Sequence, residues 1–357
     1  MDKQEYSKSE EYQKEIAEQY KKRVIKIGIA EVAEVLEKLS IIVPDVTTIK
    51  ESSVGNMNAT YLTADLAIKI NTKKDNARYL ANKVASDALG NDWPIIKVIA
   101  YDFFNKTNYE VLVMERSRGR VLLEDIFDLS QESMKEIFQQ VLETIKMLFQ
   151  IEYQNFGLIN EPNNSFSRYS DYLRDRFNKN NAAIKRQKLA DENDLEKIEK
   201  YFLKYVSLFD KEQSVYALTD VQMGNMLHEG NKLTALIDFD YSLKAPKVRT
   251  VAAILGFIGE PEQFVEGTKD YPRFKGQDFC YLSPMLQQKL PEVFADKHLL
   301  RKLNIIGIGE MVMWVAQNWS AEWNKQMIAR VLDRELAGSE VDLKKSYYGR
   351  ILTCLKY

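Results

Sequence analysis

Apolar residues recur at two different spacings along the chain, and the change between them falls near residue 119. Residues 9–39 predict two helices, because apolar side chains in the second of them return every three or four positions. Short apolar runs separated by turns follow, interrupted by one helical stretch at about 77–89. The predicted strands are 46–50, 59–63, 66–70, 96–101 and 110–114. Together these elements predict a small lobe built on an antiparallel sheet.

Beyond Gly119 the pattern becomes mainly helical. Residues 131–151 carry apolar side chains at helical spacing, which predicts an amphipathic helix with Ser130 as its N-cap. A shorter helix is expected over 169–177. The run of polar residues at 178–181 is typical of a weakly structured stretch, so we expect that helix to end there.

The end of the chain is also expected to be helical, apart from one hairpin. A helix is predicted around 195–205, two short strands flank the turn at 229–231, and the residues from about 248 read as helices. The expected fold class is therefore α+β and bilobal. Residues 1–114 would form the smaller lobe with its leading helices, and residues 115–357 would form the larger helical lobe.

Composition and charge narrow the possible functions. The chain has 357 residues, of which 45% are hydrophobic and 29% charged, which fits a globular protein. Its net charge of −2 gives no reason to expect a nucleic acid or a membrane surface as partner, and no apolar run approaches the ~20 residues of a membrane span. Two cysteines, Cys280 and Cys354, and a charged N-terminus predict a cytoplasmic protein without a disulfide framework. The two histidines, His228 and His298, lie too far apart in sequence to suggest a zinc site.

The most informative chemistry lies between residues 215 and 245. Asp220 and Asn225 occupy a turn between two apolar segments, and Asp238 ends a strand-like run eighteen residues after Asp220. Such spacing allows one carboxylate to accept a hydroxyl proton, while an amide oxygen and a second carboxylate hold magnesium. The ordinary alternative is a pair of turn residues and a structural acid. Asp240, two residues beyond Asp238, is at least as readily a structural acid or loop cap as a ligand.

Two features of the predicted sheet add to this picture. Lys69 lies inside the apolar strand 66–70, where a buried ammonium needs an anionic partner such as a phosphate, although exposed edge strands also carry lysines. The preceding turn contains Ser53, Gly55 and Asn58, whose backbone amides could fold over phosphates. A plain hairpin turn explains that segment equally well.

The junction between the two predicted lobes has the composition of a hinge. A buried strand ends in Met114 and Glu115 and runs into a polar turn that contains Ser117 and closes at Gly119. An adenine would be recognised there by main-chain groups, so side-chain identity says little. An ordinary strand end is an equally good explanation of this segment alone.

These residues, taken in order, resemble the aminoglycoside phosphotransferase and choline kinase-like family over roughly residues 25–330. The resemblance implies a protein-kinase-like fold, ATP (or GTP) and Mg²⁺ as cofactors, and transfer of the γ-phosphoryl group to a hydroxyl of a small molecule. It implies that Asp220 is the catalytic base, Asn225 and Asp238 the metal ligands, and Lys69 the phosphate-binding lysine. The main chain of Glu115 and Ser117 would contact the base. A monomer and a homodimer both remain compatible with the sequence.

The chain departs from the family pattern at three places. Leu218 and Thr219 stand where the family usually has His-Gly before the catalytic aspartate. The helix after the lysine strand usually carries a glutamate that pairs with the lysine, and Asn82 occupies the best-aligned position here. Either that pair is missing, or another acid such as Asp75 or Asp87 replaces it. The segment 244–249 is basic where the family often has an acid.

Three functions compete on this evidence. A small-molecule kinase would bind its acceptor among the C-terminal helices, where aromatic side chains could wall a pocket but more often form core. Those aromatic residues are Tyr169, Tyr172, Trp314, Trp319 and Trp323. A nucleotide-binding pseudokinase is favoured by the missing glutamate and opposed by the presence of all four catalytic-type residues. A protein kinase is disfavoured, because no glycine-rich triple loop, no Arg before Asp220 and no Ala-Pro-Glu after Asp238 occur.

Overall fold

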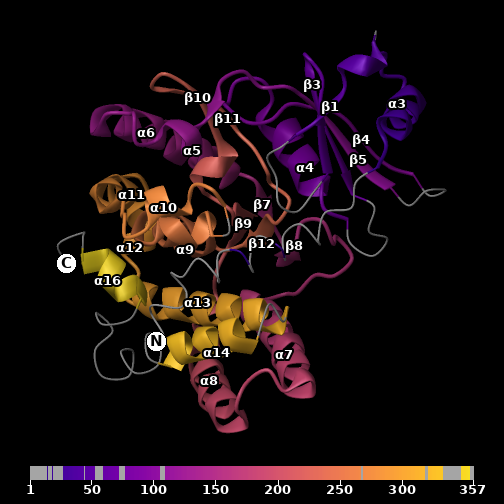
Figure 1. Ribbon diagram of the computed structural model, residues 1–357. Coiled ribbons are helices and arrows are strands. Elements are labelled where there is room, and N and C mark those ends of the chain that lie inside the picture. Colours follow the sequence, from indigo (N-terminus) through magenta and orange to yellow (C-terminus); the bar gives the residue numbers. More distant parts are fainter. Residues whose placement is uncertain are drawn as a thin grey trace.

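The smaller lobe is a twisted antiparallel sheet with the strand order β1-β2-β3-β5-β4 (Figure 1). The computed structural model describes residues 14, 18, 27–43, 45–52, 59–71, 77–104, 109–266, 268–317, 321–332 and 347–353. The strands of this lobe are β1 (Lys50–Glu51), β2 (Ala59–Leu62), β3 (Leu66–Asn71), β4 (Val98–Phe104) and β5 (Tyr109–Glu115). Its helices are α3 (Ile29–Lys38) and α4 (Leu80–Leu89). The expected antiparallel lobe is thus present, while the first of the two helices expected over 9–39 falls almost entirely outside the described residues.

Side chains along β3 point alternately to the two faces of the sheet, and this alternation places Lys69 on one of them. Ile68 and Ile70 belong to a buried cluster with helix α3, so they point to that face. Lys69 lies between them and points to the opposite face, which helix α4 covers. In the sheet it is paired with Leu112 of β5, a residue of the main core. The strand pattern therefore directs a single ammonium group away from α3 and toward the larger lobe.

Helix α4 begins where a buried acid caps it. Glu110 of β5 is fully buried, and its carboxylate accepts hydrogen bonds from the backbone N–H groups of Arg78 (2.6 Å) and Tyr79 (2.7 Å). Asn71 donates a further hydrogen bond to the same carboxylate at 3.0 Å. These N–H groups would otherwise be left unpaired at the start of the helix. Glu110 thus ties the first turn of α4 to the sheet.

The expected strand at 46–50 is wrong in its first part. Residues Val46–Thr48 form a 3₁₀ turn, and only Lys50–Glu51 pairs in the sheet. The reason is Asp45, whose side chain accepts hydrogen bonds from the Thr47 backbone N–H at 2.9 Å and from the Thr47 hydroxyl at 2.6 Å. A local side-chain bond of this kind offers the backbone an alternative to a ladder partner.

The larger lobe contains two small antiparallel sheets and most of the helices (Figure 1). One sheet has the order β11-β10-β6 and the other β7-β9-β12-β8. The strands are β6 (Arg120–Val121), β7 (Glu152–Tyr153), β8 (Gly157–Leu158), β9 (Ser214–Ala217), β10 (Met226–Glu229), β11 (Lys232–Leu236) and β12 (Leu243–Ala245). The hairpin expected around residues 229–231 is therefore confirmed as β10 and β11.

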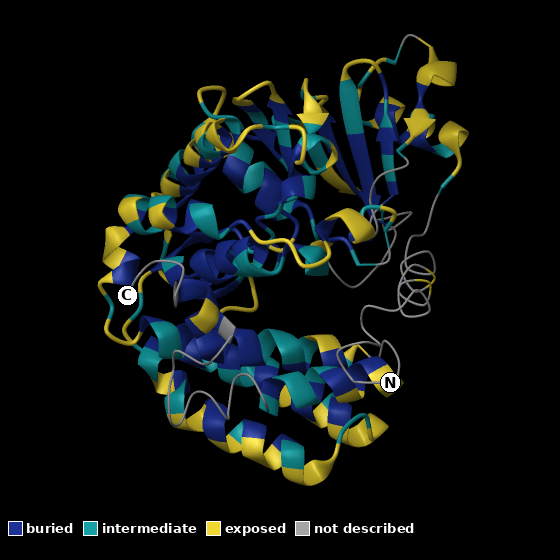
Figure 2. Ribbon diagram, turned by 60° about the vertical axis from the view of Figure 1, so that its left-hand side comes forward, coloured by how far each residue is buried: buried dark blue, intermediate teal, exposed yellow. Residues whose placement is uncertain are grey.

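The helices of this lobe surround a continuous apolar core, and the buried positions in Figure 2 concentrate in its interior and in the sheet above it. Ser130 caps the helix that follows it as expected, since its hydroxyl accepts a hydrogen bond from the Ser133 backbone N–H. The helices are α5 (Leu122–Asp125), α6 (Gln131–Leu148), α7 (Tyr169–Gln187), α8 (Glu192–Tyr205), α9 (Lys247–Gly259), α10 (Tyr271–Phe274), α11 (Ser283–Lys289), α12 (Pro291–Phe294), α13 (Leu299–Ala316), α14 (Ala321–Arg330) and α16 (Tyr347–Thr353).

The expected break at residues 178–181 is wrong, because α7 runs without interruption from Tyr169 to Gln187. Two contacts with α8 hold the polar segment in a helix. Phe177 stacks on Phe202 with ring centroids 4.1 Å apart, and the Asn181 side-chain amide donates a hydrogen bond to Glu199 at 2.9 Å. Tertiary packing of this kind outweighs the modest intrinsic cost of asparagine in a helix.

The junction between the lobes depends on a glycine. Gly119 has φ of +99°, and a Cβ at this position would lie 2.6 Å from the carbonyl oxygen of His228 in β10. We expect Gly119→Ala to lower the free energy of unfolding by at least about 1 kcal/mol, because an L side chain is strained at positive φ and also clashes here. Chemical denaturation measures this change. Gly309→Ala in α13 is the matched control: its Cβ would meet only Phe202, at 4.0 Å, so stability should not fall. Equal midpoints for the two variants would contradict the prediction.

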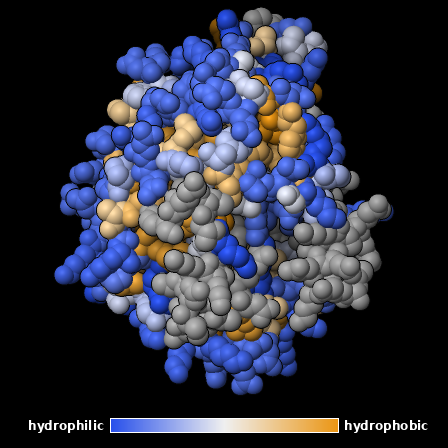
Figure 3. Space-filling model, turned by 90° about the vertical axis from the view of Figure 1, so that its left-hand side faces the viewer, coloured by the Kyte–Doolittle hydropathy of each residue, from blue (hydrophilic) through white to orange (hydrophobic). Residues whose placement is uncertain are grey.

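Hydrophilic side chains predominate among the described residues on the face seen in Figure 3, and apolar side chains form several smaller groups between them. No helix within the described part of the chain is both long and apolar enough to cross a membrane.

Candidate active site

Lys69 meets two carboxylates that follow strand β11. Its Nζ lies 2.8 Å from Oδ1 of Asp238, and 3.2 and 3.3 Å from the two carboxylate oxygens of Asp240. Lys69 is itself only 9% exposed, so these contacts supply the partners that a buried ammonium requires. The sheet of the smaller lobe and the hairpin of the larger lobe therefore meet at this ion-pair cluster.

Asp220, the predicted base, and Asn225, a predicted metal ligand, also lie in contact. The Asn225 side-chain amide donates hydrogen bonds to the Asp220 carboxylate at 2.9 Å and to the Asp220 carbonyl at 3.1 Å. The backbone N–H of Ile237, which directly precedes Asp238, donates to the Asn225 carbonyl at 3.0 Å. The structure thus joins Asp220, Asn225, Asp238 and Lys69 through a continuous series of contacts.

The residues before Asp220 support the loop in which it lies. Leu218 is buried in the main core, in keeping with a packing role at the position where the family usually has histidine. The Thr219 hydroxyl donates a hydrogen bond to the carbonyl of Tyr241 at 2.8 Å. This bond links the segment of Asp220 to the segment of Asp238 and Asp240, so the threonine strengthens the connection between the two.

Asp238 has an unusual backbone conformation, with φ of +64°. Aspartate and asparagine occupy the left-handed region more readily than other residues with a side chain, and such conformations are often found at functional sites. The conformation follows directly on strand β11 and leaves the Asp238 side chain 35% exposed, whereas the Asp240 side chain is fully buried. The two acids that contact Lys69 therefore differ sharply in their access to solvent.

Burial and neighbouring charges separate the pKa values of these acids. Burial, and then the charge of Asp238, raise the pKa of Asp220 to about 6. The same two causes raise the pKa of Asp240 to about 7. Burial also acts upward on the pKa of Asp238, but the contact with Lys69 outweighs it and holds that pKa below its usual range. Burial would lower the pKa of Lys69, yet its two carboxylate partners raise it above the ordinary value.

The donor atoms fit a magnesium ion shared with phosphates. Within the described part of the chain no group of three or more His, Cys, Asp or Glu side chains is arranged to enclose a metal. Magnesium bound together with a nucleotide usually needs only one or two protein oxygen ligands, because water and phosphates supply the rest. Asp238 offers a partly exposed carboxylate, and Asn225 uses its NH₂ group on Asp220, which leaves its oxygen for a cation.

The expected carboxylate partner of Lys69 on helix α4 is absent, and a different partner is present. Asn82 is fully buried, and its side-chain amide donates a hydrogen bond to Asp240 at 2.9 Å. Asp87 pairs with Lys83 on the surface of the same helix. Asp75 lies outside the described residues. Among the described residues, the carboxylate partners of Lys69 are therefore Asp238 and Asp240, 169 and 171 residues away in sequence, and neither Asn82 nor Asp87 pairs with it.

Two main-chain donors of the predicted hinge are already engaged in hydrogen bonds. The backbone N–H of Glu115 donates to the Lys97 carbonyl at 2.9 Å, and that of Arg116 donates to the Asp65 carbonyl at 2.7 Å. Glu115 can therefore offer a base only its carbonyl group. The Ser117 N–H makes no hydrogen bond to a described residue, so it could donate to a base. Met114 is buried at the end of β5 beside these groups.

The predicted phosphate turn with Ser53, Gly55 and Asn58 lies outside the described residues, as does Trp319. Tyr169 and Tyr172 are buried and stacked on each other, with ring centroids 5.6 Å apart, so they form core. Trp323 is buried too, while Trp314 is 37% exposed. Of the four aromatic side chains considered for an acceptor pocket that the structure describes, Trp314 is the most open to solvent.

Sequence reasoning did not identify two neighbours of the candidate site, Asn160 and Arg249. Asn160 donates hydrogen bonds to the carbonyl groups of Asp240 (2.5 Å) and Arg78 (2.8 Å), and accepts one from the Ala81 N–H (2.7 Å). Arg249 is buried at the start of α9, is paired with Glu310, and lowers the pKa of Asp220. The basic segment noted at 244–249 was the only sequence signal for Arg249, and Asn160 had none.

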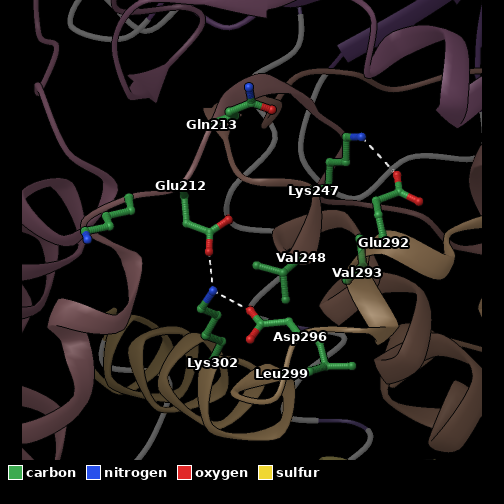
Figure 4. A pocket seen from close by; sticks show the side chains of 10 residues that line it. Glu212, Gln213, Lys247, Val248, Glu292, Val293, Asp296, Leu299 and Lys302 are labelled. Carbon is green, nitrogen blue, oxygen red and sulfur yellow. Dashed lines mark hydrogen bonds and ion pairs between the residues drawn. The ribbon is translucent and has the colours of Figure 1, made fainter.

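A separate cavity of about 340 Å³ lies in the larger lobe and contains none of the residues above (Figure 4). Its charges are largely paired with one another: Lys302 contacts Glu212 and Asp296, and Lys247 lies 2.9 Å from Glu292. The cavity is lined by Lys211, Glu212, Gln213, Lys247, Val248, Glu292, Val293, Asp296, Leu299 and Lys302. It is therefore not part of the candidate active site.

The sequence matches no family model and no curated protein. The structure, in contrast, is similar to solved aminoglycoside phosphotransferases. The streptomycin-ATP-APH(2'')-IIa ternary complex gives a TM-score of 0.60 at 12% identity, covering 90% of this chain and 99% of that one. APH(4)-Ia gives 0.56 at 14% identity, covering 85% and 97%. APH(2'')-Ib with bound ADP gives 0.54 at 15% identity, covering 84% and 98%. The predicted α+β bilobal, protein-kinase-like fold is therefore confirmed.

Proposed function

We propose that this chain is a small-molecule kinase, which transfers the γ-phosphoryl group of a nucleoside triphosphate to a hydroxyl of a small acceptor. The observation that carries the proposal is the series of contacts from Lys69 through Asp238 and Asn225 to Asp220. A carboxylate that can accept a proton, two oxygen donors for a cation and a buried ammonium for phosphate are what this reaction needs.

Asp220 would accept the proton of the acceptor hydroxyl as its oxygen attacks the γ-phosphorus and the bond to the leaving diphosphate breaks. With a pKa of about 6, the Asp220 carboxylate is mainly ionised at neutral pH and can serve as that acceptor. The hydrogen bonds from Asn225 orient it. Positioning of the hydroxyl in line with the phosphorus would account for most of the remaining acceleration.

Asp238 and Asn225 would hold a magnesium ion, whose positive charge would offset that of the phosphate oxygens. Lys69 would contact the phosphates from the side of the sheet, and the main chain at Glu115 and Ser117 would receive the base. ATP is the favoured donor, because the similar structures were solved with ATP, AMP-PNP or ADP. Main-chain contacts from Glu115 and Ser117 alone would not exclude GTP as the donor.

The acceptor would be a small hydroxylated molecule bound among the helices of the larger lobe. The similar structures contain hygromycin B, streptomycin and gentamicin, so an aminoglycoside or another antibiotic is the first class to test. Arg249 lies close enough to Asp220 to influence its pKa. A panel of acceptors should therefore include anionic and neutral molecules as well as cationic ones.

The test is nucleotide consumption with each member of the panel, measured with and without Mg²⁺. The proposal expects at least one hydroxylated acceptor to stimulate Mg²⁺-dependent ATP consumption in the wild type but not in Asp220→Asn. If the protein bound Mg²⁺·ATP and no acceptor in a broad panel stimulated turnover, the pseudokinase alternative would replace the kinase. A protein that bound no nucleotide at all would contradict both.

A further inference from the structure

We infer that Asp240 is the carboxylate that positions Lys69, and that Asn82 and Asn160 hold Asp240 in place, since the only acid of helix α4, Asp87, pairs with Lys83 at the surface. The inference rests on the proposed nucleotide site. It assigns a role to three residues that the order of motifs along the chain does not reveal.

The first argument is the different accessibility of the two acids that contact Lys69. Asp240 is 1% exposed, and its Oδ1 atom already accepts hydrogen bonds from Lys69 at 3.2 Å and from Asn82 at 2.9 Å. Asp238 keeps about a third of its side chain exposed. A ligand for a metal ion that arrives with a nucleotide has to be reachable, so Asp238 suits that role and Asp240 suits a permanent contact with Lys69.

The second argument is the chemical fit between Asn82 and Asp240. Asn82 is fully buried and uses both ends of its amide on the same segment: its NH₂ group donates to the Asp240 carboxylate, and its oxygen accepts from the Phe239 N–H at 3.1 Å. A carboxylate at position 82 could not donate, and it would place a second negative charge beside Asp240. In this pair the helix therefore supplies the amide and the loop supplies the acid.

The third argument is the way in which helix α4 is held. Asn160 donates to the carbonyl groups of Asp240 and Arg78 and accepts from the N–H of Ala81, at distances of 2.5 to 2.8 Å. The Tyr216 hydroxyl donates to the carbonyl of Ala81 at 3.0 Å. Neutral hydrogen bonds therefore fix the first turn of α4 against the segment of Asp240. The helix does not need an ion pair with Lys69 to stay in place.

The arrangement has a consequence for nucleotide binding. Asp238 could leave Lys69 to contact a metal ion, and Lys69 would still face the Asp240 carboxylate. A buried ammonium without any anionic partner would be strongly unfavourable. Two acids on one lysine thus allow one of them to change partner while the other keeps the ammonium group in position.

The experiment compares four proteins: wild type, Asp240→Asn, Asn82→Glu, and the double variant. The double variant carries the carboxylate at position 82 of helix α4 and the amide at position 240. We expect Asp240→Asn to weaken AMP-PNP binding about 10- to 100-fold, by analogy with the loss of a partner that orients a metal ligand. Asn82→Glu alone should also weaken it, because two carboxylates then meet. The double variant should bind more tightly than either single variant. Asp87→Asn, which changes an exposed acid on the same helix, is the control and should bind as the wild type does.

A second readout needs no nucleotide. Labelling of Lys69 by an amine-reactive reagent, followed by peptide mass spectrometry, should be faster in Asp240→Asn and slower again in the double variant. Wild-type binding and labelling rates in Asp240→Asn would overturn the inference. A double variant no better than the single ones would also overturn it, as would a loss confined to Mg²⁺ affinity, which would make Asp240 a metal ligand. A wild type that bound no nucleotide would overturn the proposed function, while the labelling rates would still test Asp240.

Discussion

Asp220→Asn should lower kcat by at least about 10²-fold, the lower end of the contribution of a positioned acid or base. Asparagine has the same shape as aspartate and keeps an oxygen that can accept the hydrogen bond from Asn225, so the loop should retain its structure. What it loses is the ability to take a proton. Steady-state kinetics with the best acceptor from the panel measure kcat, and calorimetry measures AMP-PNP affinity, which should change little.

The control for this variant is Asp194→Asn, which removes an acid paired with Lys197 on helix α8. Surface pairs of this kind contribute little to stability, so kcat, affinity and unfolding midpoint should all stay near the wild-type values. If Asp220→Asn retained wild-type kcat, Asp220 would not be the base. If it lost nucleotide affinity in proportion to kcat, its role would lie in binding and not in proton transfer.

The fold could be predicted from local patterns because the decisive signals are local. The alternation of Ile68, Lys69 and Ile70 is enough to place the lysine on one face of a strand. The turn at 229–231 and Ser130 likewise act on residues close to them in sequence. The predicted secondary structure was wrong where a contact with another side chain outweighed the local sequence pattern. Asp45 bends the chain into a turn, and Phe202 and Glu199 keep the polar middle of α7 helical.

The site was harder to predict because its contacts span long stretches of sequence. Asp220, Asn225 and Asp238 lie close together in sequence, and their spacing was the signal from which the candidate site was predicted. Asp240, the second carboxylate that contacts Lys69, gave no such signal, since an acid two positions after a predicted metal ligand reads as an ordinary loop acid. Asn160 contacts Asp240 across 80 residues and belongs to no recognisable motif. A buried amide of this kind becomes visible only when the chain is folded.

Low sequence identity explains why the structure is similar to solved kinases although the sequence matches no family model and no curated protein. The similar kinases share 12–15% of their residues with this chain, yet their structures cover at least 84% of it. A fold survives such divergence when the apolar pattern is kept, because cores tolerate many hydrophobic substitutions. In this chain Lys69 receives a carboxylate from the loop after β11, while helix α4 contributes the amide of Asn82 to that carboxylate.

Asp238→Asn should raise the Mg²⁺ concentration needed for half-maximal turnover at least about tenfold. Loss of a residue that merely orients a metal ligand already costs 10- to 100-fold in metal affinity or activity, so loss of a charged ligand should cost no less. Stability should change little, because Lys69 keeps its contacts with Asp240. Activity measured against Mg²⁺ concentration at saturating ATP, together with thermal unfolding without nucleotide, separates the two effects.

Asp238→Ala provides the matched comparison, because position 238 has φ of +64°. Asparagine adopts this conformation readily, whereas alanine there should cost about 1–2 kcal/mol of stability. The two variants should thus share the Mg²⁺ defect, and only the alanine variant should unfold at a lower temperature. A normal Mg²⁺ requirement in both would show that Asp238 does not bind the metal. A stability loss of equal size in both would show that the charge of Asp238, and not its backbone conformation, stabilises the folded protein.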